Sequence, residues 1–121
     1  MDNFEIAGNK FVPEILFNAT SGILSFKGKA ILEDSKEIFG PAKDWVSDFI
    51  TAFTGKIVID IDLIYFNSVV SKELFSIMTL VKKYNGDKEV RWHYDEEDEE
   101  ALEEGKSFQE ETKLPFEFIP E

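Results

Sequence analysis

The sequence predicts an α/β fold in which helices cover a mixed β-sheet. Segments of period-two hydrophobicity alternate along the chain with segments of helical period, the order that produces parallel crossovers. Residues 56–66 are apolar on one face throughout, as in a central strand. The chain has 121 residues, 43% of them hydrophobic, enough for one core. We therefore treat residues 1–121 as a single domain with at least one right-handed crossover.

The first predicted elements form a hairpin. Ile15 and Phe17 alternate with their neighbours, and apolar residues resume at 23–26. The intervening segment 18–22 ends in a glycine, which is typical of a turn between two antiparallel strands.

An amphipathic helix follows the hairpin. Asp34 and Glu37 have the spacing of a capping box, and apolar residues recur at helical spacing as far as Phe53. Pro41 lies inside this pattern and has no backbone N–H. We therefore expect one initial turn, a break near residue 40, and a main helix that begins at Pro41 and ends at Gly55.

The remaining elements repeat the alternation. We expect a central strand at 56–66, an amphipathic helix from about 70 to 84, a strand at 89–94, an acidic helix at 95–104 and a final extended edge at 114–119. Functional sites of open α/β sheets lie where strands end at their carboxyl edge. The junction 65–68, between the central strand and its helix, is therefore the place to look for one.

Composition narrows the classes of partner. Thirteen basic and 25 acidic residues give a net charge of −12, which argues against nucleic acid or an anionic membrane as partner. The sequence has no cysteine, so it has no disulfides and no thiolate metal site, as suits a reducing cytoplasm. It shows no signal peptide and no apolar run near the length of a membrane span. We expect a cytoplasmic protein.

Candidate catalytic residues are few. His93 is the only imidazole, lies in a predicted strand, and is best interpreted as a cross-strand residue rather than part of a Ser–His–acid triad. Asp60 and Asp62 share one face of the central strand and could bind magnesium, yet no third ligand is visible. Solvent exposure or pairing with Lys56 or Lys72 explains them better. The sequence therefore predicts a non-enzymatic protein without cofactor or metal, and a small metal-dependent enzyme is the weaker alternative.

The acidic run 95–104 contains eight carboxylates and no cation. It lacks the alternating ligands and central glycine of an EF-hand loop. A solvated helix explains it, with its early acids near the positive end of the helix dipole. The alternative is a constitutive protein-interaction module that docks a basic partner on this run.

Ser68 is the most informative position because it follows a buried strand and begins a helix. Ordinary helix capping explains a serine at this place. The functional alternative is phosphorylation, since a phosphate at a helix amino terminus meets free backbone N–H groups and the positive dipole end. Such a group would add about −1.5 to −2 charge to a docking surface without disturbing the fold.

The residues around Ser68 resemble the signature of the SiaC-type bacterial regulatory phosphoproteins. The junction Tyr65-Phe66-Asn67-Ser68 with Ser71 and Lys72 carries this resemblance. Further motifs match in the same order, from about residue 4 to residue 118. They are Pro13-Glu14-Ile15, Gly22, Glu33-Asp34-Ser35, Phe39-Gly40-Pro41, Trp45 and Leu114-Pro115-Phe116. In addition, Val90 to Asp95, the acidic run after it and Gly105 resemble the Trp-Tyr-Tyr-Glu motif and acidic stretch of the family.

The resemblance implies a fold similar to anti-sigma-factor antagonists, also called STAS-like domains, and a partner switch. A kinase of the anti-sigma-factor type would phosphorylate Ser68 and a PP2C-type phosphatase would reverse it. The unmodified form would bind and activate a diguanylate cyclase, raising cyclic di-GMP and promoting biofilm formation. Asn67, Ser71 and Lys72 would complete the partner-binding surface. Ser68 replaces the threonine of the best-known member, and Val69 and Val70 replace small or polar residues.

Overall fold

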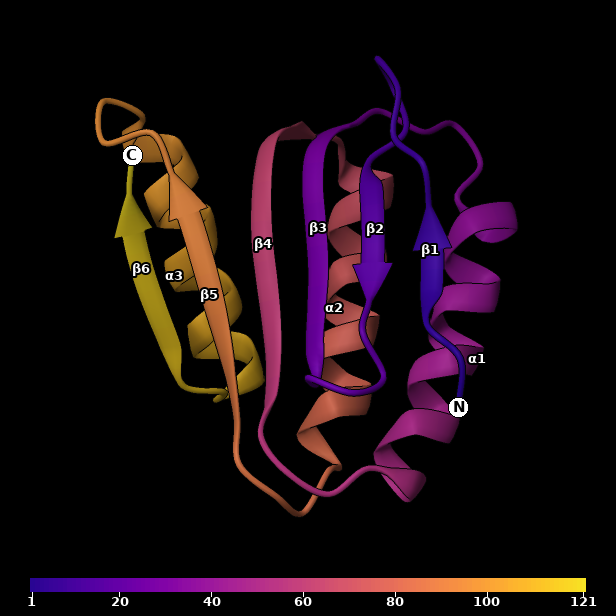
Figure 1. The fold of residues 1–121 in the computed structure, drawn as a ribbon. Helices are drawn as coiled ribbons and strands as arrows, with labels where there is room; N and C mark the ends of the chain where they lie inside the picture. Colours follow the sequence, from indigo (N-terminus) through magenta and orange to yellow (C-terminus); the bar gives the residue numbers. More distant parts are fainter.

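The computed structural model describes residues 1–121 as one six-stranded sheet and three helices (Figure 1). The elements are β1 (Phe4–Ile6), β2 (Glu14–Phe17), β3 (Ile23–Ala30), α1 (Lys36–Ala52), β4 (Ile57–Phe66), α2 (Ser68–Lys82), β5 (Lys88–Tyr94), α3 (Glu99–Thr112) and β6 (Phe116–Pro120). The strands lie in sequence order across the sheet. β1, β2 and β3 pair antiparallel, whereas β3 to β6 pair parallel.

The helices all cover one face of the sheet. Each parallel crossover moves one strand further in the same direction, and right-handed crossovers that advance in one direction place their helices on one side. Figure 1 shows α1, α2 and α3 behind the same face. The opposite face, here called the open face, carries the alternate residues of each strand.

The core fills the space between the sheet and the helices. Strand residues such as Ile59 and Trp92 are at most 2% exposed, as are Phe39 of α1 and Leu74 of α2. Trp92 packs on aromatic rings from three elements, namely Phe66, Phe108 and Phe116. The predicted mixed sheet with covering helices is therefore confirmed.

Two predicted helices differ from the structure. α1 runs unbroken from Lys36 to Ala52 with Pro41 inside it, so the predicted break near residue 40 is wrong. Buried Phe39 and Ala42 lie on either side of exposed Pro41, and this packing holds both turns on one axis. α2 ends at Lys82, two residues before the predicted end.

The acidic helix also begins later than predicted. Residues 95–98 form a turn, and α3 starts at Glu99 because the Asp98 carboxylate accepts a hydrogen bond from Ala101 N at 3.1 Å. The helix then continues to Thr112, well beyond the acidic run, since Gly105 and Phe108 are buried against the sheet. The short strand β1 was not predicted from the sequence. None of the helices is long and apolar enough to cross a membrane.

Candidate functional site

The β4–α2 junction lies at the carboxyl edge of the parallel strands and is shaped by a bulge. Leu63 is opposite Gly28 and Tyr65 is opposite Lys29, so Ile64 is an extra residue in β4. The φ of Gly28 is +100°, which a glycine adopts without strain. The bulge leaves Ile64 75% exposed and Tyr65 55% exposed beside the start of α2. These two adjacent apolar side chains are a candidate docking surface.

Asn67, rather than Ser68, caps α2. Its Oδ1 accepts a hydrogen bond from Val70 N at 3.2 Å, and its Nδ2 donates to the Leu32 carbonyl at 2.9 Å. The Asn67 backbone N–H also donates to the carbonyl of Ala30 at 3.3 Å. The interpretation of Ser68 as the capping residue is therefore wrong, because the side chain of the residue before it makes the capping hydrogen bond.

Ser68 is the first residue of α2 and is exposed. Its hydroxyl makes no hydrogen bond within the protein, and the backbone N–H groups of Ser68 and Val69 have no acceptor. The first turn of α2 therefore offers a hydroxyl with no structural task and two free amides at the positive end of the helix dipole.

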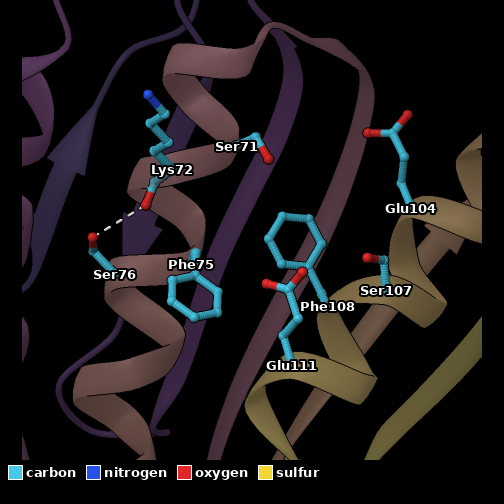
Figure 2. Close-up of a pocket in the computed structure, with 8 residues that line it drawn as sticks. All are labelled: Ser71, Lys72, Phe75, Ser76, Glu104, Ser107, Phe108 and Glu111. Carbon is cyan, nitrogen blue, oxygen red and sulfur yellow. Dashed lines mark hydrogen bonds between the residues drawn. The ribbon is translucent and has the colours of Figure 1, made fainter.

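The predicted partner residues Ser71 and Lys72 line a groove between α2 and α3 (Figure 2). The groove has a volume of about 430 Å³ and begins one turn beyond Ser68. Its lining residues are Ser71, Lys72, Phe75, Ser76, Glu104, Ser107, Phe108 and Glu111. The structure thus places Asn67, Ser68, Ser71 and Lys72 on one continuous surface at the start of α2.

The groove wall on α3 is acidic. Burial raises the pKa of the Glu104 carboxyl above its usual value, and the nearby charges of Asp98 and Glu100 raise it further. Phe75 of α2 is 37% exposed at the same groove. The surface therefore combines an apolar floor with negative charge. The acidic run was predicted, but its place beside the 70–84 helix was not, because that pattern does not show which helix packs against it.

The open face brings His93 and Glu121 next to the two aspartates of β4. His93 Nε2 lies 2.8 Å from Asp60 Oδ1, and Asp62, His93 and Glu121 each offer one ligand atom within 4.8 Å of the others. The predicted pairing of the two aspartates with Lys56 or Lys72 is wrong. Lys56 pairs with Glu89 at 3.3 Å, and the sheet register presents His93 to the aspartates instead. Parallel-strand register is set by long-range packing, so no local pattern reveals it.

Comparison with known proteins identifies relatives over almost the whole chain. The family model described as "SiaC family regulatory phosphoprotein" matches residues 6–121. An uncharacterized protein of Pseudomonas aeruginosa strain UCBPP-PA14 is 32% identical over 119 residues, which cover 96% of this chain and 94% of that protein.

Solved structures of SiaC from Pseudomonas aeruginosa have the same fold. Apo-SiaC is 29% identical with a TM-score of 0.90, covering 98% of this chain and 99% of that one. SiaC in complex with the diguanylate cyclase SiaD, which it activates, is 29% identical with a TM-score of 0.91 and the same coverage. Both the α/β fold and the resemblance noted from the motifs are confirmed. The chain therefore belongs to the SiaC family of regulatory phosphoproteins, and it is a regulator rather than an enzyme, as the sequence predicts.

Proposed function

We propose that this protein activates a diguanylate cyclase and that reversible phosphorylation of Ser68 switches the activation. The observation that carries the switch is the exposed, unbonded Ser68 hydroxyl at the first position of α2. The solved complex of SiaC with the cyclase SiaD supports the choice of partner. Ser68, Asn67, Ser71 and Lys72 form the surface on which the switch acts.

A phosphate on Ser68 is compatible with the fold. The two free N–H groups of the first turn can donate to its oxygens, and the helix dipole contributes about 0.3–1 kcal/mol more. Lys72 lies four residues later on the same helix side, where an opposite charge at i+4 pairs favourably. Figure 2 shows the Lys72 side chain directed out of the groove, free for such a pair.

The same phosphate changes the charge of the surface on which a partner would dock. The added charge of about −1.5 to −2 stands beside exposed Ile64 and Tyr65, which an apolar partner surface would cover. A docked partner would have to desolvate or repel this charge. A hundredfold loss of affinity corresponds to only about 2.7 kcal/mol, within reach of one such group.

A kinase and a phosphatase complete the switch. The kinase is of the anti-sigma-factor type and uses ATP, and a PP2C-type phosphatase removes the phosphate, so we place the protein in the cytoplasm. The exposure of Ser68 supports access by both enzymes. The STAS-like fold, and with it this pairing of enzymes, stays a prediction from the resemblance.

The test places phosphoserine directly at position 68 by genetic code expansion and measures cyclic di-GMP synthesis by purified SiaD. We expect the unmodified chain to raise synthesis and the phosphoserine-68 chain to lose at least tenfold in apparent affinity. Ser21 lies in the hairpin turn beside the start of β4, at the other end of the strands from Ser68. A chain with phosphoserine at position 21 is the matched control and should activate normally.

Ser68→Ala separates the switch from the activation. We expect it to activate, to fold normally and to accept no phosphate from the kinase. Equal activation by the two phosphoserine proteins would reject the switch. Loss of binding in Glu97→Gln/Glu99→Gln/Glu100→Gln/Glu103→Gln, with none for phosphoserine at 68, would favour the constitutive acidic module instead.

A further inference from the structure

One ring nitrogen on the open face has no partner. The Asp60 carboxylate can only accept a hydrogen bond, so His93 Nε2, 2.8 Å away, is the donor, and in the neutral imidazole Nδ1 then has a lone pair for a ligand. Nδ1 is buried and makes no hydrogen bond. The nearest carboxylate oxygen, Glu121 Oε1, lies 3.6 Å away, beyond hydrogen-bond range. A buried polar atom left in this state calls for a bound water or ion.

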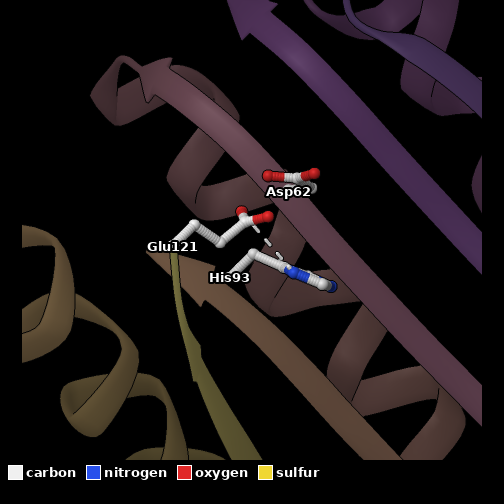
Figure 3. Close-up of side chains that lie close together, drawn as sticks. All are labelled: Asp62, His93 and Glu121. Carbon is white, nitrogen blue, oxygen red and sulfur yellow. Dashed lines mark ion pairs between the residues drawn. The ribbon is translucent and has the colours of Figure 1, made fainter. Parts of the chain in front are cut away.

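Two further carboxylates lie near the imidazole. Asp62 of β4 and Glu121, which follows β6, lie with His93 of β5 in a cluster whose ligand atoms are within 4.8 Å of one another (Figure 3). Donors in a tetrahedral zinc site are about 3.4 Å apart, given metal–ligand distances of about 2.1 Å. The separation of 3.6 Å between His93 Nδ1 and Glu121 Oε1 is close to this value, and side-chain rotations of half-buried Asp62 and exposed Glu121 would bring the donors together.

We propose that His93 Nδ1 and the carboxylates of Asp62 and Glu121 bind a first-row divalent transition metal ion, with Zn²⁺ as the probe. An imidazole with two carboxylates suits such an ion, whereas magnesium and calcium prefer all-oxygen sites. Asp60 is a positioning residue, because its hydrogen bond fixes the tautomer that aims Nδ1 at the ion. Three protein ligands leave a coordination position for water or for a partner's side chain.

The backbone holds the last ligand in place. Glu121 N–H donates to the Tyr94 carbonyl at 2.8 Å, and the Glu121 carbonyl accepts from Glu96 N at 3.2 Å. The side chain therefore starts from a fixed point beside the end of β5. An ion held here would connect β4 to the segment after β6 across the intervening strand, so binding would raise the melting temperature of the chain.

The experiment uses the chelator-treated full chain and two readouts. Calorimetric titration with ZnCl₂ gives the affinity, with MgCl₂ as the competing ion. Because the sequence has a single histidine, ¹⁵N-imidazole NMR reports on His93 alone. We expect stoichiometric Zn²⁺ binding, a metal-induced shift confined to Nδ1, and a zinc-dependent rise in melting temperature.

Variants identify the ligands. His93→Gln, Asp62→Asn and Glu121→Gln should each lose at least tenfold in Zn²⁺ affinity. Asp60→Asn keeps all three ligands, should lose ten- to a hundredfold, and should change the tautomer signals of the zinc-free protein.

The control Glu97→Gln/Glu99→Gln/Glu100→Gln removes exposed acids outside the site and should bind as the parent does. The proposal is overturned if His93→Gln binds Zn²⁺ within twofold of the parent, or if zinc leaves both imidazole nitrogens unshifted. Backbone NMR spectra of each zinc-free variant establish that it is folded, so weak binding cannot be ascribed to unfolding. Activation of SiaD by Ser68 variants is a separate readout, so failure of this site does not bear on the switch.

Discussion

The Ser68 junction and the His93 cluster both draw on β4, yet they are assembled in different ways. The junction is built from consecutive residues, with Asn67 capping the helix whose first residue is Ser68. The cluster joins Asp62, His93 and Glu121, which lie on neighbouring strands or just after them but far apart in sequence. The comparison teaches that local chemistry fixes the first region and sheet register fixes the second.

Trp92→Ala has the largest expected effect because this residue supports both regions. Its ring, 2% exposed, packs 6.0 Å from Phe66 beside the junction, and its indole N–H donates to Ala101 at 3.0 Å. On the other side of the strand, the next residue is His93. We expect a loss of about 3–5 kcal/mol in the free energy of unfolding, measured by urea denaturation.

Trp92→Phe tests whether packing or the hydrogen bond dominates. It keeps an aromatic ring but removes the indole N–H that donates to the Ala101 carbonyl, so a loss of about 1–3 kcal/mol is expected. A Trp92→Ala loss below about 1 kcal/mol would contradict the idea of a shared support for both regions.

Asn67→Ala follows in size and isolates the junction. The substitution removes the cap on α2, worth about 1 kcal/mol, together with the bond to the Leu32 carbonyl. We expect a total loss of about 1–2 kcal/mol by thermal or urea unfolding. The matched control Ser68→Ala should change stability by less than about 0.5 kcal/mol, because its hydroxyl bonds nothing in the protein. Equal losses for the two would show that Ser68 has a structural task.

The contrast between a region built by local chemistry and one built by sheet register explains which features could be predicted from the sequence. Ile57, Ile59 and Ile61 alternate so regularly that the central strand follows directly, and Ser68 after it marks a helix start. The sequence could also place Asp60 and Asp62 on one strand face. It could not place His93 next to them, because the register of β4 with β5 depends on packing contributed by all the neighbouring elements.

The two wrong predictions about helices, the break in α1 and the start of α3, have a common explanation. Local rules predict a break near residue 40 and an acidic helix from Asp95, since proline lacks an N–H and acids favour helix amino termini. Buried Phe39 and Ala42 override the first rule, and the Asp98 cap with buried Phe108 overrides the second. Tertiary contacts between segments distant in sequence therefore decided the outcome in both places.

Gly28→Ala tests whether the bulge shapes the Ser68 junction without affecting the His93 cluster. Gly28 has a φ of +100°, so an alanine there is strained although nothing lies within 4 Å of an added Cβ. We expect a loss of about 1 kcal/mol or more, and weaker activation of the cyclase as Ile64 and Tyr65 shift. Gly40→Ala is the control: it lies inside α1 with open space around it and should gain about 0.5–1 kcal/mol. Unchanged Zn²⁺ binding in Gly28→Ala would show that the bulge does not influence the His93 cluster.

Glu104→Gln is the smallest expected effect and concerns the groove beside the junction. Burial and the charges of Asp98 and Glu100 raise the pKa of Glu104, so the folded protein favours the protonated carboxyl. The protonated Glu104 carboxyl contributes stability that is fully present below the pKa of the group in the unfolded chain. This stability is lost as the pH rises through the higher pKa of the group in the folded protein, so ionised Glu104 destabilises the protein at neutral pH. The variant should therefore gain less than about 0.5 kcal/mol at pH 7 and nothing near pH 3. Glu103→Gln, at an exposed neighbouring position in the same helix that does not line the groove of Figure 2, should show no such pH-dependent gain in melting experiments. A gain of equal size in both variants would mean that the general negative charge of the acidic run, rather than the groove, disfavours the Glu104 carboxylate.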